Sequence, residues 1–71
     1  MRKMKLHDRV KATRLRSRMT LAEVARAAGI TPQGYGNIER GHSMPRVDTL
    51  ARVCVALGVR LDTLLSRVDF S

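Results

Sequence analysis

The stretch TLAEVARAAGITPQGYGNIERG, residues 20–41, decides the fold of this 71-residue chain because it holds the start and stop signals of two short helices. Thr20 and Glu23 have the spacing of a capping box, in which each side chain bonds the backbone N–H of the other residue. They predict a first helix over about 21–28.

The second helix follows after only three residues. Gly29 is suited to the left-handed position that ends a helix, and Thr31 followed by Pro32 supplies a new N-cap and first helical residue. A helix over about 32–40 is therefore predicted. So short a connection does not let two helices lie side by side, and a steep crossing is the geometry of a helix-turn-helix, whose second helix reads DNA.

Positive charge is concentrated at the start of the chain. The net charge is +8, and residues 1–18 contribute +7 of it with eight Lys or Arg and one Asp. This balance predicts attraction to a polyanion. The alternative interpretation is that these basic residues are only the solvated face of a helix. However, like charges one turn apart destabilise a helix by roughly a few tenths of a kcal/mol per pair.

Three further helices are predicted around this pair. One spans about 6–17, one begins near residue 46 and ends before Gly58, and a short one spans about 61–67. The middle one is the most amphipathic, and its inward stripe is Val47, Leu50, Ala51, Cys54 and Leu57. No strand alternation or internal repeat is present. The prediction is one all-α domain, a compact five-helix bundle over residues 1–71.

Several classes of site and location are not expected. The single cysteine, Cys54, cannot form an intrachain disulfide, and no Cys/His cluster has metal-ligand spacing. The longest apolar run, 53–59, is far shorter than the roughly 20 residues that span a bilayer. The basic start lacks the features of a secretory signal, so a cytoplasmic location is expected. We predict no cofactor, metal, membrane or small-molecule partner.

Together these motifs resemble the Cro and phage-repressor type of helix-turn-helix domain over about residues 10–65. The matching residues are Arg14, Met19-Thr20, Glu23, Ala25, Gly29-Ile30-Thr31, Ile38-Glu39-Arg40-Gly41, Pro45, Thr49-Leu50, Ala56-Leu57-Gly58-Val59 and Leu61-Asp62. The resemblance implies a five-helix, lambda-repressor-like fold. It also implies a sequence-specific transcriptional regulator, a repressor that binds a palindromic operator in double-stranded DNA.

The resemblance implies that Pro32, Gln33 and Asn37 face base edges in the major groove. Both amides match the donor and acceptor pair of adenine, and Pro32 offers apolar contact only. The alternative is that these positions are ordinary exposed helix surface.

Phosphate contacts are expected from the N-terminus of helix 21–28 and from the loop after Gly41. The predicted phosphate-binding residues are Arg16, Arg18, Arg40, His42, Ser43 and Arg46. One departure from the family is Leu21, which stands where many members carry a phosphate-clamping glutamine.

Two pairs of residues raise structural questions. Arg14 and Glu39 match a partly buried salt bridge of the family, which fixes geometry more than it adds stability. Gly34 and Gly36 lie inside the predicted reading helix, where each glycine costs roughly 0.8–1 kcal/mol relative to alanine. Either the missing side chains let the backbone lie close to DNA, or the glycines arose by sequence drift at positions that neighbouring residues hold in place. The sequence leaves both interpretations open.

A homodimer is expected because one reading helix covers only a few base pairs. The predicted interface residues are Leu61, Leu64, Leu65, Val68 and Phe70, which alternatively close the core. The rival function is a protein-interaction module, such as an antitoxin or accessory factor. An enzyme is not expected. His7 and His42 fall on a predicted helix surface and in a loop, and the proximity of His42, Ser43 and Asp48 comes without a pocket or oxyanion donor.

Overall fold

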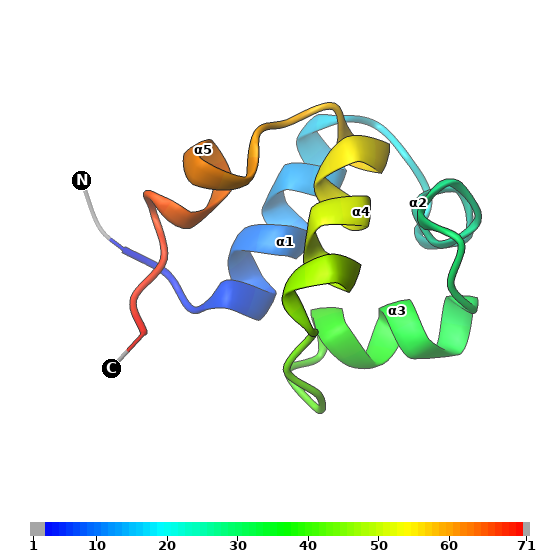
Figure 1. Cartoon of the computed structure of the whole chain (residues 1–71), viewed down its shortest axis with the longest axis horizontal. Helices are drawn as coiled ribbons and strands as arrows, with labels where there is room; N and C mark the ends of the chain where they lie inside the picture. Colours follow the sequence, from blue (N-terminus) through cyan, green and yellow to red (C-terminus); the bar gives the residue numbers. More distant parts are fainter. Residues whose placement is uncertain (1–2, 71) are drawn as a thin grey trace.

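The computed structural model describes residues 3–70. It contains five helices, which are α1 (Leu6–Arg16), α2 (Leu21–Ala28), α3 (Pro32–Glu39), α4 (Val47–Leu57) and α5 (Leu61–Leu65) (Figure 1). Within residues 3–70 no strand forms, and one isolated parallel bridge joins Met4 to Val68. The predicted all-α, five-helix, lambda-repressor-like fold is confirmed.

The helix-turn-helix forms through the predicted local signals. Thr20 N donates to Glu23 Oε1 at 2.7 Å, and Glu23 N donates to Thr20 Oγ1 at 3.1 Å. Gly29 takes a φ of 72°, and Thr31 Oγ1 accepts a hydrogen bond from Gly34 N at 3.0 Å. Figure 1 shows α2 end-on while α3 lies across the view, so the two helices cross steeply.

The core forms where α4 packs against α2, with α1 and α5 closing it. Leu50, Val53, Cys54 and Leu57 are its buried stripe on α4. The prediction for Val47 is wrong, because it lies at the edge of this stripe in the first turn and is 74% exposed. Val53, which is not in the predicted stripe, is fully buried.

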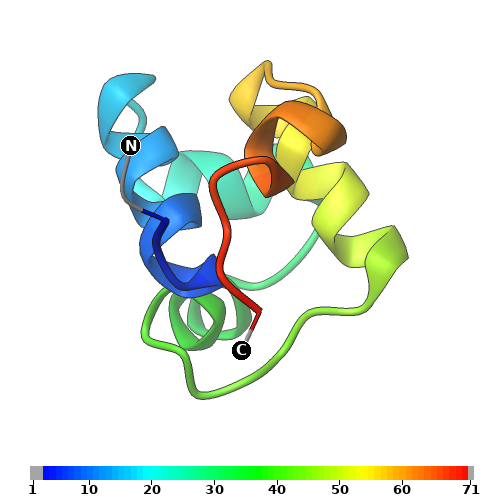
Figure 2. The same ribbon diagram turned by 90° about the vertical axis from the view of Figure 1, so that its left-hand side faces the viewer.

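The two ends of the described chain lie side by side (Figure 2). Met4 N donates to the Arg67 carbonyl at 2.9 Å, and Asp69 N donates to the Met4 carbonyl at 2.7 Å. This pairing ends α5 at Leu65, two residues before the predicted end, and carries Val68 into the core.

The burial of Leu64 and Val68 corrects part of the predicted dimer interface. Leu64 is fully buried and Val68 nearly so, so neither side chain is available to a second copy. Leu61 and Leu65 are half-buried against the core, and Phe70 is 68% exposed. None of the described helices has the length and apolar character needed to cross a membrane.

Candidate nucleic-acid interface

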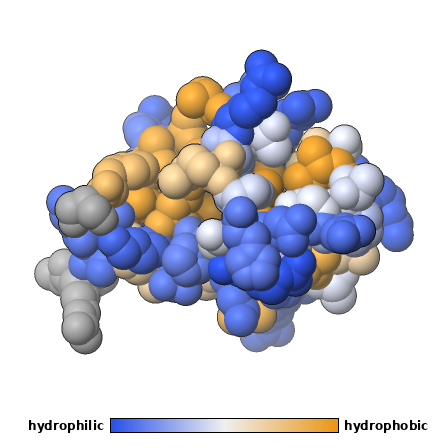
Figure 3. All heavy atoms as spheres, turned by 90° about the horizontal axis from the view of Figure 1, so that it is seen from below, coloured by the Kyte–Doolittle hydropathy of each residue, from blue (hydrophilic) through white to orange (hydrophobic). Residues whose placement is uncertain are grey.

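Helix α3 has one face in the core and one face in solvent. Tyr35, Ile38 and Glu39 are buried on the inner face. Gln33, Asn37 and Arg40 follow one another at spacings of four and three residues, which places them on one stripe of the helix. Gln33 and Arg40 are exposed, as is Pro32, and Asn37 is half-buried. Figure 3 views the molecule from the side of α3 and shows mainly hydrophilic residues across the middle of this face.

Two residues of the outer stripe bond to each other. Arg40 Nη2 donates to Asn37 Oδ1 at 2.8 Å. Arg40, predicted as a phosphate contact, is thus joined to a predicted base-reading residue. The spacing of three residues between them was the available sequence signal for this contact.

A buried ion pair fixes α3 to α1. Arg14 Nε donates to Glu39 Oε2 at 2.6 Å and Arg14 Nη2 donates to Glu39 Oε1 at 3.0 Å. Arg14 Nη1 also donates to the Met19 carbonyl at 3.1 Å, which ties the pair to the start of α2. Burial alone would raise the pKa of Glu39, but the hydrogen bonds and charge of Arg14 outweigh it and hold the pKa below its ordinary value. The orientation of α3 is therefore set by a charged contact inside the fold.

Tyr35 is a neighbour of both Arg14 and Glu39. Its side chain is fully buried, and its hydroxyl has no hydrogen-bond partner among the described residues. Burial, together with the neighbouring Glu39 carboxylate, raises the pKa of the Tyr35 hydroxyl far above its ordinary value. Tyr35 is therefore a neutral core residue that holds α3 by packing.

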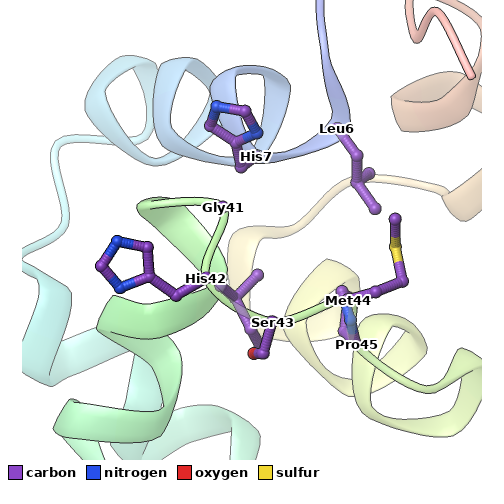
Figure 4. Close-up of a pocket in the computed structure, with 8 residues that line it drawn as sticks. Leu6, His7, Gly41, His42, Ser43, Met44 and Pro45 are labelled. Carbon is purple, nitrogen blue, oxygen red and sulfur yellow. The ribbon is translucent and has the colours of Figure 1, made fainter. Parts of the chain in front are cut away.

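The loop after α3 is seated against α1 (Figure 4). Gly41 has a φ of 77°, and a Cβ built on it would lie 2.9 Å from His7 Nδ1. A cavity of about 160 Å³ lies between Leu6 and His7 on one side and residues 41–45 on the other. This close approach holds the loop beside the C-terminal end of α3, where His42 N donates to the Asn37 carbonyl at 2.9 Å.

The predicted phosphate contacts fall into two groups. His42, Ser43 and Arg46 are exposed in the loop after α3, and Arg18 is exposed in the turn before α2. Arg16 instead lines a hollow between α1 and the end of α5, together with Arg9, Thr63, Ser66 and Arg67. Positions 14 and 16 are about 200° apart around a helix. Because Arg14 faces α3, Arg16 points away from it.

A steep helix pair whose second helix displays amide and guanidinium groups in solvent defines a DNA-binding transcription regulator of the helix-turn-helix class. The family model described as helix-turn-helix matches residues 10–64, and this chain belongs to that family, of the Cro/C1 type.

Solved structures share this fold. The chain is 31% identical to the clp gene regulator ClgR from Corynebacterium glutamicum, over 87% of this chain and 80% of that one, with a TM-score of 0.83. It is 24% identical to the DNA-binding domain of the P22 c2 repressor, over 100% and 92% of the two chains, with a TM-score of 0.85. The P22 c2 repressor in complex with a synthetic operator is 21% identical, over 87% and 94%, with a TM-score of 0.78. No curated protein matches the sequence significantly.

Proposed function

We propose that this chain represses transcription by binding a palindromic operator in double-stranded DNA as a homodimer. The observation that carries the proposal is the outer stripe of α3, where Gln33 and Asn37 present amide groups while the inner face is fixed in the core. Family membership and the ClgR likeness support it. The protein acts by occupying the operator in the cytoplasm, without a reaction or cofactor of its own.

Base reading is assigned to Pro32, Gln33 and Asn37. Phosphate binding is assigned to residues that border α3 or the N-terminus of α2, which are Arg18, His42, Ser43 and Arg46. Loop residues next to a reading helix are well placed to fix its register on the duplex. Arg16 is left out of this set because its hollow lies on the α5 side of α1.

A second copy is proposed to dock on the apolar surface between α4 and α5. Val55, 80% exposed, lines a shallow hollow there with Ala51, Val59 and Leu61. Arg60 and Asp62 stand at its edge and pair with each other, Nε to Oδ1 at 3.1 Å. An apolar patch with both charges at its rim can meet a copy of itself across a twofold axis. Of the residues predicted for the dimer interface, Leu61 lines this hollow, and Leu65 and Phe70 are not among its lining residues.

The test is selection of bound sequences from a random duplex pool, followed by affinity measurements over a range of salt. A symmetric motif is expected, with log affinity falling by about 0.9 per phosphate contact for each unit of log salt. Gln33→Ala should relax the preference at one position in each half-site. Arg46→Ala should weaken all sequences alike and reduce the salt slope by about one contact.

Failure to recover a motif at low ionic strength would overturn the proposal. In that case the rival function, a protein-interaction module on the same fold, would better explain the missing glutamine clamp at Leu21.

A further inference from the structure

The guanidinium of Arg40 occupies the space that a side chain at position 36 would fill. A Cβ built on Gly36 would lie 2.9 Å from Arg40 Nη1, 3.2 Å from Nη2 and 3.4 Å from Cζ. Gly36 is buried although it neighbours the exposed stripe, and Arg40 covers it. Gly36 therefore provides a seat on which the Arg40 side chain lies back along α3, toward the helix N-terminus.

From this seat Arg40 controls the orientation of the Asn37 amide. A guanidinium has only donors, so the amide atom that faces it must be the oxygen. The contact from Arg40 Nη2 to Asn37 Oδ1 is 2.8 Å, a good charge-assisted hydrogen bond. The Asn37 Nδ2 group, with its two N–H donors, is then the part of the amide left to meet a base.

This orientation changes which base suits Asn37. A free asparagine reads adenine by donating to N7 and accepting from the N6 amino group. The Asn37 oxygen keeps a second lone pair, but a base amino group that donated to it would have to approach beside the guanidinium that already donates to it. Asn37 therefore presents mainly its two N–H donors, and the adjacent guanidinium adds positive charge. Guanine offers two acceptors on its major-groove edge, N7 and O6, and no donor there.

We propose that Arg40, seated on Gly36, makes Asn37 select guanine, whereas asparagine alone would select adenine. The proposal rests on the DNA-reading role of α3 proposed above and specifies its preference at one base pair. Arg40 is a positioning residue that acts through Asn37. Gly36 has a function in this arrangement, because any side chain there displaces the guanidinium.

The test starts from the operator selected by the unaltered protein. The base pair that Asn37 faces is the one whose preference is lost in Asn37→Ala. Dissociation constants are then measured for all four base pairs at that position. The unaltered protein should prefer guanine, and Arg40→Ala should shift the preference toward adenine by about tenfold.

Gly36→Ala gives the decisive comparison because it keeps both Asn37 and Arg40. Its methyl group should displace the guanidinium and shift the base preference in the same direction as Arg40→Ala. Gly34→Ala is the matched control, since its Cβ would meet Thr31 Oγ1 at 3.0 Å and lies away from Arg40. Arg46→Ala controls for lost charge and should weaken all four sequences without reordering them.

A readout without DNA separates this proposal from the proposed function. The side-chain amide resonance of Asn37, followed by NMR in the free protein, should move in both Arg40→Ala and Gly36→Ala and stay in place in Gly34→Ala. An unmoved resonance in the first two variants would show that Arg40, lying over Gly36, does not hold the Asn37 amide. The proposal would also be overturned by a selected motif with adenine opposite Asn37 in the unaltered protein, or by one whose base order neither variant changes. If the resonance moves but no motif is recovered, the proposed function fails and the guanine preference fails with it.

Discussion

Glu39 shows how one residue can decide whether α3 is presented at all. Its side chain is only 5% exposed, and both carboxylate oxygens accept hydrogen bonds from Arg14. Glu39→Ala would leave the Arg14 guanidinium without its partner in a largely buried position. We expect the free energy of unfolding, measured by urea denaturation, to fall by about 3–5 kcal/mol.

Glu23→Ala is a suitable control because this carboxylate is exposed in the capping box of α2. It should destabilise much less than Glu39→Ala. Replacing both members of the buried pair, as in Arg14→Met with Glu39→Leu, should recover part of the loss. A Glu39→Ala variant as stable as the parent would show that the ion pair does not hold the fold.

The Glu39 carboxylate also makes the folding stability depend on pH in the acidic range. Despite burial, its hydrogen bonds with Arg14 place the pKa of Glu39 below its ordinary value of 4.5, so folding favours the ionised form. Its contribution is complete above that ordinary value and is lost as the pH falls through the lowered pKa of the folded state. The melting temperature should therefore decrease as the pH falls below about 4.5.

Thr20 N–H and the Thr20 side chain lower the pKa of Glu23 as well, so part of this acid loss belongs to the capping box. Comparison with Glu39→Gln isolates the buried residue. That variant should be less stable at neutral pH, and its melting temperature should fall less steeply in acid. An equally steep fall in both proteins would assign the acid sensitivity to other groups.

At the scale of the element, α3 combines a strong start with a weak interior. Thr31 and Pro32 cap it, but Gly34 and Gly36 lower its intrinsic helix propensity. Gly36→Ala should raise the free energy of unfolding by about 1 kcal/mol, which for a domain of this size is about 4–8 °C in melting temperature. The atoms nearest to the new methyl group belong to the far end of the exposed Arg40 side chain, which can move aside.

Calorimetry of Gly36→Ala therefore tests whether stability and base selection are opposed in this helix. A gain in melting temperature together with a changed base preference is expected. A lower melting temperature would mean that the contact of Arg40 with Gly36 stabilises α3 more than the glycine weakens it.

The elements also show what a sequence can and cannot specify. The ends of α2 and α3 were predictable because caps such as Thr20, Gly29 and Thr31 act on residues within a few positions of themselves. The environments of Val47 and Leu64 were not, since burial depends on which distant segment covers a position. For the proposed site, the stripe of α3 followed from its helical period. The seating of Arg40 on Gly36 required side-chain coordinates.

On the scale of the whole molecule, part of the basic charge that predicted a polyanionic partner is used within the fold. Arg9 Nε donates to the Leu64 carbonyl at 3.0 Å, and Arg14 pairs with Glu39. Both belong to the basic segment 1–18. The net charge of +8 still favours association with DNA. Under the proposed function, the residues that matter for binding are those beside α3.

Self-association is the remaining property of the whole molecule that decides how it would recognise an operator. If a second copy docks over Val55, Val55→Asp places an unpaired charge in an apolar contact and should raise the dimer dissociation constant at least tenfold in sedimentation equilibrium. Affinity for an operator with two half-sites should then fall, while affinity for a single half-site stays the same, because the reading helix is untouched. Leu15→Asp, which adds the same charge at a 57% exposed leucine on α1, should change neither quantity. If Phe70→Asp weakens the dimer and Val55→Asp does not, the two copies meet over the chain ends instead.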